Sequence, residues 1–162
     1  MDNKCAKLLP RIPIKEGQVL AEYLNELYQI YQSQISGGSF TFHGKPIHVF
    51  TDLNYNLQQQ SFEHLTTKGS NDRLYNLARC ERIAWIKDIL SGLCAGCDDY
   101  RLFPDTTWKS SKAKRYIIWC VKEDYVIILE ERQKKVLLIT AYCVIYPHKR
   151  NSLEAAYKKS LK

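Results

Sequence analysis

Four side chains that could act together on a phosphodiester lie on two neighbouring strand-like segments in the second half of the chain. Glu130 and Arg132 share one face of the first segment, and Thr140 and Tyr142 share one face of the second. A carboxylate can take a proton, a guanidinium can stabilise developing negative charge, and hydroxyl groups can position a phosphate. RNA carries its own nucleophile, the 2′-hydroxyl, so these residue types predict chemistry on RNA that needs no metal and no other cofactor.

Whether the four side chains meet depends on the turn between the two segments. A three-residue loop would place Glu130 opposite Leu138 and Ile128 opposite Thr140, with all four side chains on one surface. A two-residue loop would move Thr140 and Tyr142 to the other side of the sheet. The sequence leaves this register open.

Two further residues complete the predicted catalytic set. Either His64 or Glu130 could act as the acid or base. Either Arg82 or Arg132 could stabilise the pentacoordinate phosphorane. Each residue also has a structural interpretation, because histidines are often core residues and Glu130 with Arg132 can form an ordinary surface ion pair. The cations predicted to bind RNA around this set are Arg79, Arg115, Lys134, Lys135, Lys149 and Arg150.

The positive charge of the chain is concentrated in its C-terminal third. The 162 residues include 24 Lys and Arg against 17 Asp and Glu. Residues 109–162 hold 13 basic and 5 acidic side chains, whereas residues 1–108 hold 11 and 12. This asymmetry favours a polyanionic partner, with nucleic acid ahead of an anionic membrane, although a solvated Lys-rich surface would give the same counts.

Composition limits the class of protein further. A hydrophobic content of 45% supports a folded core, and no apolar run reaches the roughly 18 residues of a membrane span. The N-terminus has no apolar secretory segment, so we expect a cytoplasmic protein whose six cysteines are free thiols. Cys94 and Cys97 form a single CxxC without a second ligand pair, so no metal site is predicted.

A helix and three strands are expected to position the candidate site. Helical spacing of apolar residues predicts a helix over residues 73–90, capped by Asn71 or Asp72 and followed by Gly92. After a loop, short charged turns join three predicted strands into an antiparallel meander. The loop is expected at residues 94–108, the strands at 115–121, 125–132 and 136–146, and a short final helix around Leu153, Ala156 and Tyr157. One side of the last strand should face the helix, namely Leu137, Ile139, Ala141, Cys143 and Ile145.

The N-terminal third is expected to add a helix over residues 16–35 and a hairpin over residues 40–50. The predicted fold class is therefore α+β, a helix packed on an antiparallel β-meander with an N-terminal helix and β-hairpin extension. We divide the chain into this extension, residues 1–55, and a main domain, residues 56–162.

Within residues 60–158, several segments resemble nucleases of the barnase–EndoU–colicin–RelE-like (BECR) superfamily, in its phage- and toxin-associated branch. The resemblance rests mainly on Arg79-Cys-Glu-Arg82-Ile-Ala-Trp85 and on the strand ends Glu130-Glu-Arg132 and Leu138-Ile-Thr-Ala-Tyr142. It implies a BECR-like nuclease domain that cleaves tRNA or mRNA without a metal ion. The positions that correspond to the superfamily's site residues are His64, Arg82, Arg132, Thr140 and Tyr142, with Glu130.

We therefore expect an endoribonuclease, a toxin or phage-associated effector, that leaves 2′,3′-cyclic phosphate ends. An acidic antitoxin or immunity protein would be a fitting partner for so basic a chain. Two other function classes stay open. Eleven tyrosines and three tryptophans would also suit a non-catalytic RNA-binding or regulatory module. The Tyr-rich N-terminal helix would also suit a protein-interaction domain that docks an antitoxin-like partner or a second copy of the chain.

Overall fold

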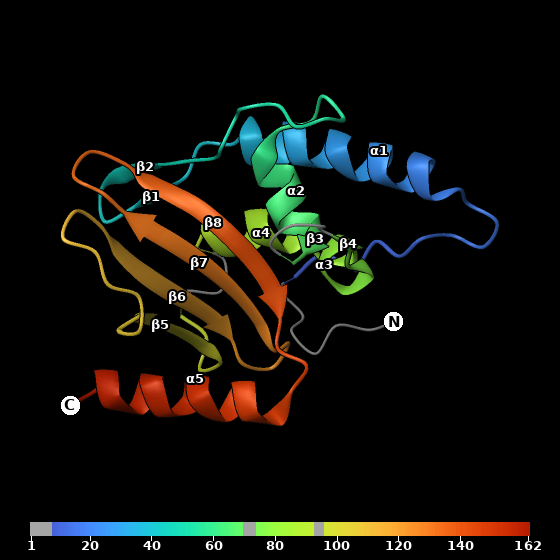
Figure 1. Ribbon diagram of the computed structural model, residues 1–162. Coiled ribbons are helices and arrows are strands. Elements are labelled where there is room, and N and C mark those ends of the chain that lie inside the picture. Colours follow the sequence, from blue (N-terminus) through green and yellow to red (C-terminus); the bar gives the residue numbers. More distant parts are fainter. Residues whose placement is uncertain (1–7, 70–73, 93–95) are drawn as a thin grey trace.

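The computed structural model describes residues 8–69, 74–92 and 96–162. In these ranges the chain forms an α+β fold around one six-stranded sheet with the strand order β1-β2-β8-β7-β6-β5. Figure 1 shows the strongly twisted sheet with α5 on one side and α1 and α2 on the other. The α+β class agrees with the sequence-based prediction.

The predicted meander forms the larger part of this sheet. Strands β6 (Lys114–Cys120), β7 (Tyr125–Glu131) and β8 (Val136–Cys143) pair antiparallel in order. A further strand, β5 (Tyr100–Pro104), pairs antiparallel with β6, where the sequence predicted a loop. A five-residue run that ends in proline gives a weak strand pattern, and proline is tolerated there because β5 is an edge strand.

The sheet is mixed, and the prediction of a wholly antiparallel sheet is wrong. Strands β1 (Thr41–Phe42) and β2 (Lys45–His48) form the predicted hairpin. Strand β2 then runs parallel to β8, with Ile47 opposite Val136. Local periodicity carries no information about such a pairing between distant segments. As a result, residues 1–55 and 56–162 contribute strands to the same sheet.

The β7–β8 hairpin has one register at its turn and another beyond a bulge, and together they decide the pairing that the sequence left open. At the turn, the Arg132 backbone N–H donates to the Lys135 carbonyl at 2.8 Å, and Glu130 lies opposite Leu137. This is the register of a two-residue loop, so the predicted pairing of Glu130 with Leu138 is wrong.

Farther along the hairpin the register shifts by one residue between Ile128 and Leu129. Ile128 then lies opposite Thr140, as in the register of a three-residue loop. The extra residue on β8, Ile139, makes this shift. Thr140 therefore lies on the same face of the sheet as Glu130.

Helices and apolar side chains cover the two faces of the sheet differently. On the first, here called the helix face, α1 (Leu20–Tyr31), α2 (Gln60–Thr66) and α4 (Ile83–Leu90) pack against the larger hydrophobic cluster. On the second, here called the α5 face, α5 (Pro147–Ser160) packs against a smaller cluster that includes Phe103 and Trp119. A 14-residue helix stands where a short one was predicted.

The bulge also overturns the prediction that Leu137, Ile139, Ala141, Cys143 and Ile145 all face the helix. Ala141 and Cys143 do pack in the helix-face cluster, but they are joined there by Leu138, and Ile139 packs on the α5 face. Because the extra residue reverses the alternation of β8, one side of that strand cannot remain apolar throughout.

The predicted helix over residues 73–90 is two helices. Leu74–Tyr75 form strand β4, which pairs with β3 (Thr67–Lys68), and α3 (Leu77–Glu81) begins only after Asn76. The Asn76 side chain accepts the backbone N–H of Arg79 and is the actual cap. The predicted caps Asn71 and Asp72 lie outside the described residues.

The backbone of Arg82, with φ −107° and ψ 11°, separates α3 from α4. Gly92 follows the last turn with φ +84°, as predicted for a helix C-terminus. At the N-terminus, α1 continues into a π-helical turn, Gln32–Ser36, close to the predicted end. None of the helices formed by the described residues has both the length and the apolar character needed to cross a membrane.

Candidate functional site

A buried carboxylate lies between two arginines at the end of β7. Arg132 approaches Glu130 Oε1 with Nε at 3.0 Å and Nη2 at 2.9 Å, and Arg115 Nε donates to Oε2 at 3.1 Å. The side chain of Glu130 is 5% exposed, that of Arg115 27% and that of Arg132 48%. The carboxylate is therefore covered by two guanidinium groups that themselves reach solvent.

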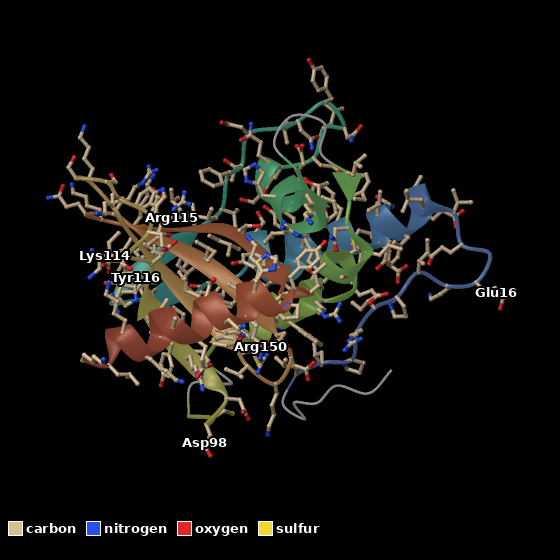
Figure 2. All side chains as sticks on the ribbon, turned by 60° about the horizontal axis from the view of Figure 1, so that its bottom comes forward. Glu16, Asp98, Lys114, Arg115, Tyr116 and Arg150 are labelled. Carbon is tan, nitrogen blue, oxygen red and sulfur yellow. The ribbon has the colours of Figure 1, made fainter. Side chains whose placement is uncertain are left out.

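The pairing of the strands explains this arrangement. Arg115 on β6 lies directly opposite Glu130 on β7, so the two side chains share the α5 face. Trp108, from the loop after β5, packs over Arg115 with the guanidinium carbon 4.3 Å from the ring centre. Figure 2 shows Lys114, Arg115 and Tyr116 together at this end of the sheet. We call Glu130, Arg115, Arg132 and Trp108 the Glu130 cluster.

A second group of polar side chains meets beside β8. Arg79 Nη1 donates to the backbone carbonyls of His64 at 3.1 Å and Thr67 at 2.8 Å, and to Thr140 Oγ1 at 3.3 Å. The Thr140 hydroxyl in turn donates to the His64 carbonyl at 3.0 Å. The Arg79 guanidinium carbon lies 5.8 Å from the ring centre of Tyr142. We call Arg79, Thr140 and Tyr142 the Thr140 cluster.

The phenol of Tyr142 keeps its proton at ordinary pH. Burial raises its pKa, the negative charge of Asp105 raises it further, and Arg79 partly opposes both effects. Asp105 itself is attached to β6, because its backbone N–H donates to the Arg115 carbonyl at 2.9 Å. Tyr142 thus remains a neutral hydroxyl donor on the α5 face.

Thr140 and Tyr142 share the α5 face with the Glu130 cluster, two and four residues along the strands from Glu130. Glu130 follows Ile128 by two residues on β7, and Thr140 lies opposite Ile128. A hydroxyl, a phenol, a carboxylate and the guanidinium groups of Arg115 and Arg132 therefore lie on one side of the β6–β7–β8 hairpins, and Arg79 reaches Thr140 from α3. The structure thus brings Glu130, Arg132, Thr140 and Tyr142 to the same surface, together with two predicted RNA-binding residues, Arg79 and Arg115.

His64 and Arg82 are placed differently from this group. His64 reaches the Thr140 cluster through its backbone carbonyl, while its ring lies 6.0 Å from that of Phe50 and lines a hollow with Asn54 and Glu63. The Arg82 guanidinium donates to the Ala78 carbonyl at 2.7 Å and lies 5.3 Å from the ring of Trp85. Trp85 belongs to the helix-face core, so Arg82 packs against that core rather than beside Glu130.

The remaining predicted RNA-binding cations divide between the two ends of the sheet. Lys134 and Lys135 are exposed in the turn beside Arg132. Lys149 is exposed at the start of α5. Arg150 pairs with Asp124 and lies 5.4 Å from the ring of Trp119, so it attaches α5 to the sheet. Figure 2 shows Arg150 well away from Lys114 and Arg115.

His43 lies at the end of the sheet that carries Arg115 and Tyr116, and the sequence did not identify it as a site residue. Its Nδ1 lies 2.9 Å from Glu131 Oε2, on the side of β7 opposite to Glu130. Only its place in a His-Gly turn, between two short strand patterns, marked it in the sequence.

Within the described ranges, His, Cys, Asp and Glu side chains form no group of three or more suited to a metal ion. Cys94 of the CxxC lies outside the described residues, whereas Cys80, Cys97, Cys120 and Cys143 are not in disulfide bonds. Comparisons of the chain with protein-family models, with curated proteins and with solved structures give no match. The similarity to BECR nucleases therefore stands as a resemblance of the quoted residues alone.

Proposed function

We propose that the protein is a metal-independent endoribonuclease and that the Glu130 cluster binds the reacting phosphate. The observation that carries this proposal is the Glu130 carboxylate beneath two guanidinium groups, on the same face as the hydroxyls of Thr140 and Tyr142. A base, cations and hydroxyl donors on one surface are what cleavage by the 2′-hydroxyl of RNA requires.

The geometry suggests a role for each group. Arg132 is half exposed and can turn from Glu130 Oε1 toward a phosphate, while Arg115 holds Oε2. Freed on one oxygen, Glu130 accepts the proton of the 2′-hydroxyl as the bond from O2′ to phosphorus forms. The arginines stabilise the charge on the phosphorane oxygens. As the bond to O5′ breaks, O5′ takes a proton from solvent water and Glu130 returns its proton to the solvent, leaving a 2′,3′-cyclic phosphate and a 5′-hydroxyl, while Thr140 and Tyr142 position the neighbouring RNA.

The broader biological role follows from the resemblance of residues 60–158 and is proposed on that ground. A BECR-like nuclease of the toxin or phage-associated kind would act in the cytoplasm on tRNA or mRNA. Its basic surface would suit an acidic antitoxin or immunity protein that covers the exposed Lys134 and Lys135.

A non-catalytic RNA-binding module is the second candidate, and one observation favours it. Both oxygens of Glu130 already accept hydrogen bonds, and its side chain is 5% exposed. If the arginines stay in place, the carboxylate is a structural counter-ion that fixes two phosphate-binding guanidinium groups. Binding would then persist without cleavage.

The first experiment is incubation of the purified protein with total tRNA and with mRNA in excess EDTA, followed by analysis of the fragment ends. We expect fragments with 2′,3′-cyclic phosphate and 5′-hydroxyl ends. Glu130→Gln should lower the cleavage rate by about 100-fold or more, because a general base contributes about 10²- to 10⁴-fold. Arg132→Ala should lower it comparably, since the guanidinium stabilises the transition state.

Lys87→Gln is the matched control, because it removes one positive charge from an exposed position on α4 and should leave the rate unchanged. Intact RNA together with salt-sensitive binding would replace the nuclease by the binding module. Intact RNA without binding would overturn both candidates.

A further inference from the structure

The turn of the β1–β2 hairpin presents an aromatic ring at the same end of the sheet as the Glu130 cluster. His43 and Gly44 form a two-residue turn in which both residues have positive φ, +51° and +74°. Asn-Gly is the pair best suited to this turn. Histidine also reaches positive φ, so the turn accepts it while holding an imidazole outward.

The ring of His43 is fixed in place by its neighbours. It stacks on Phe42 with ring centres 3.9 Å apart and planes at 27°, and it meets Tyr116 edge-on at 5.1 Å. Its Nδ1 is 2.9 Å from Glu131 Oε2. Even so, 45% of the His43 side chain is exposed. The turn therefore offers a pre-oriented aromatic surface to solvent.

Positive charges lie beside this ring. Lys45 Nζ lies 3.6 Å from Glu131 Oε2 and donates to the Arg132 carbonyl at 2.9 Å. The exposed Lys114 has its Nζ 5.4 Å from the ring centre of Tyr116. Figure 2 shows Lys114 and Tyr116 next to Arg115. We call Phe42, His43, Tyr116, Lys45 and Lys114 the hairpin platform.

The hairpin platform adjoins the Glu130 cluster across the end of one strand. Glu131, which holds His43, and Glu130, which holds the two arginines, are consecutive residues that point to opposite faces of β7. Arg132 contacts both sides, because its carbonyl accepts Lys45 and its guanidinium binds Glu130. A strand of nucleic acid at one site therefore has the other within reach around the rim of the sheet.

We infer that the hairpin platform binds an unpaired nucleobase, which stacks on His43 while Lys114 contacts a neighbouring phosphate. This inference rests on the proposed function, since it names the substrate class as single-stranded RNA. Exposed aromatic rings flanked by cations suit single strands because every unpaired base has a free face. A duplex hides those faces, so it would meet only the cations.

The test compares the binding of a labelled single-stranded RNA with that of the same sequence in a duplex, by fluorescence anisotropy in EDTA. His43→Asn removes the ring and keeps a residue that accepts positive φ. It should weaken single-strand binding by about 5- to 100-fold and leave duplex binding unchanged. Lys114→Gln should instead reduce the slope of log affinity against log salt by about 0.7.

His48→Asn is the matched control, because His48 is an exposed histidine on β2 of the same hairpin, and it should bind as the wild type does. A second readout needs no variant: addition of a mononucleotide to the wild-type protein should shift the ring-proton resonances of His43 upfield by ring stacking.

Three results would overturn the inference. If the wild type binds or cleaves RNA, and His43→Asn binds single strands equally tightly, the inferred base-binding role of the hairpin platform is wrong and the proposed function stands. If the wild type prefers the duplex, the substrate class is wrong. If the wild type neither binds nor cleaves RNA, the platform and the proposed function fall together.

Discussion

At the scale of single residues, Arg79 has a structural role that the sequence did not predict. The sequence suggested an RNA contact for Arg79, yet its Nη1 donates to His64 O, Thr67 O and Thr140 Oγ1. One guanidinium thus joins α2, β3 and β8, next to the Tyr142 ring. Its first role is to hold the Thr140 cluster together.

We therefore expect Arg79→Ala to destabilise the protein by about 2–3 kcal/mol, because it leaves part-buried carbonyl groups without their charged donor. Arg79→Lys should recover only part of this loss, since the lysine side chain is one atom shorter than the path to Nη1 and replaces the guanidinium beside the Tyr142 ring. Urea denaturation followed by circular dichroism measures both changes. Lys134→Ala, at an exposed turn position, should change the free energy of unfolding by less than about 0.5 kcal/mol. An Arg79→Ala variant as stable as the wild type would contradict this role.

The candidate site was only partly predictable from residue types. Alternation along a strand was enough to pair Glu130 with Arg132 and Thr140 with Tyr142, because side chains of a strand point to alternating faces. It could not show that Arg115 reaches Glu130, which depends on the β6–β7 register. His64 was chosen for its imidazole and for its position in the resemblance, whereas in the structure its backbone carbonyl is the group that meets Thr140.

At the scale of elements, local signals predicted the long strands and missed the features that interrupt them. The meander strands are rich in β-branched and aromatic residues, and short charged turns separate them, so their existence was readable. The bulge at Ile139 has no signature, because an inserted apolar residue looks like any other strand residue. Yet this bulge is what returns Thr140 to the face of Glu130.

The start of α3 gives an element-scale prediction. Asn76 caps this helix by accepting the Arg79 backbone N–H at 3.1 Å, and Arg79 is the residue that joins the Thr140 cluster. Asn76→Ala should lower the free energy of unfolding by about 1 kcal/mol, because it removes an N-cap acceptor. Asn76→Asp, which keeps an acceptor oxygen, should remain close to the wild type in the same urea titration. Equal losses in both variants would show that the cap is not the cause.

At the scale of the whole molecule, the N-terminal third is part of one hydrophobic core. Tyr23, Leu27 and Tyr31 of α1 are fully buried in the cluster that also contains Ile127 and Leu129 of β7. The charge asymmetry in the sequence indicated a basic C-terminal region. In the fold, some of these basic residues, such as Lys114 and Arg115, lie at one end of the sheet. Lys45 from the N-terminal third joins them there through the Arg132 carbonyl. Composition could not predict that convergence, because it depends on the parallel β2–β8 pairing.

This shared core also sets how stability depends on alkaline pH. Burial raises the pKa of Cys80 from 9.0 to about 12, and burial also raises the pKa of Tyr23, Tyr31 and Tyr125 above the ordinary value of 10.0. A raised folded-state pKa means that the unfolded chain loses its proton first as pH increases. The stabilisation is therefore complete below pH 9.0, the ordinary value for Cys80, and declines toward about pH 12.

Urea titrations from about pH 8 to about pH 11 should show the free energy of unfolding falling by up to about 1.4 kcal/mol per pH unit for each such group. The fall should begin with Cys80 and steepen once the unfolded-state tyrosines ionise. Cys80→Ala should reduce the first part of the fall, to which Cys143 also contributes because burial raises its thiol pKa, and should leave the steeper part, because it eliminates one thiol and no phenol. A thiol reagent should likewise leave Cys80, fully buried and hydrogen-bonded to the Thr66 carbonyl, unmodified in the native protein at neutral pH. If the free energy of unfolding does not change from about pH 8 to about pH 11, these thiols and phenols ionise equally in the folded and unfolded states, so that their burial is not maintained in solution.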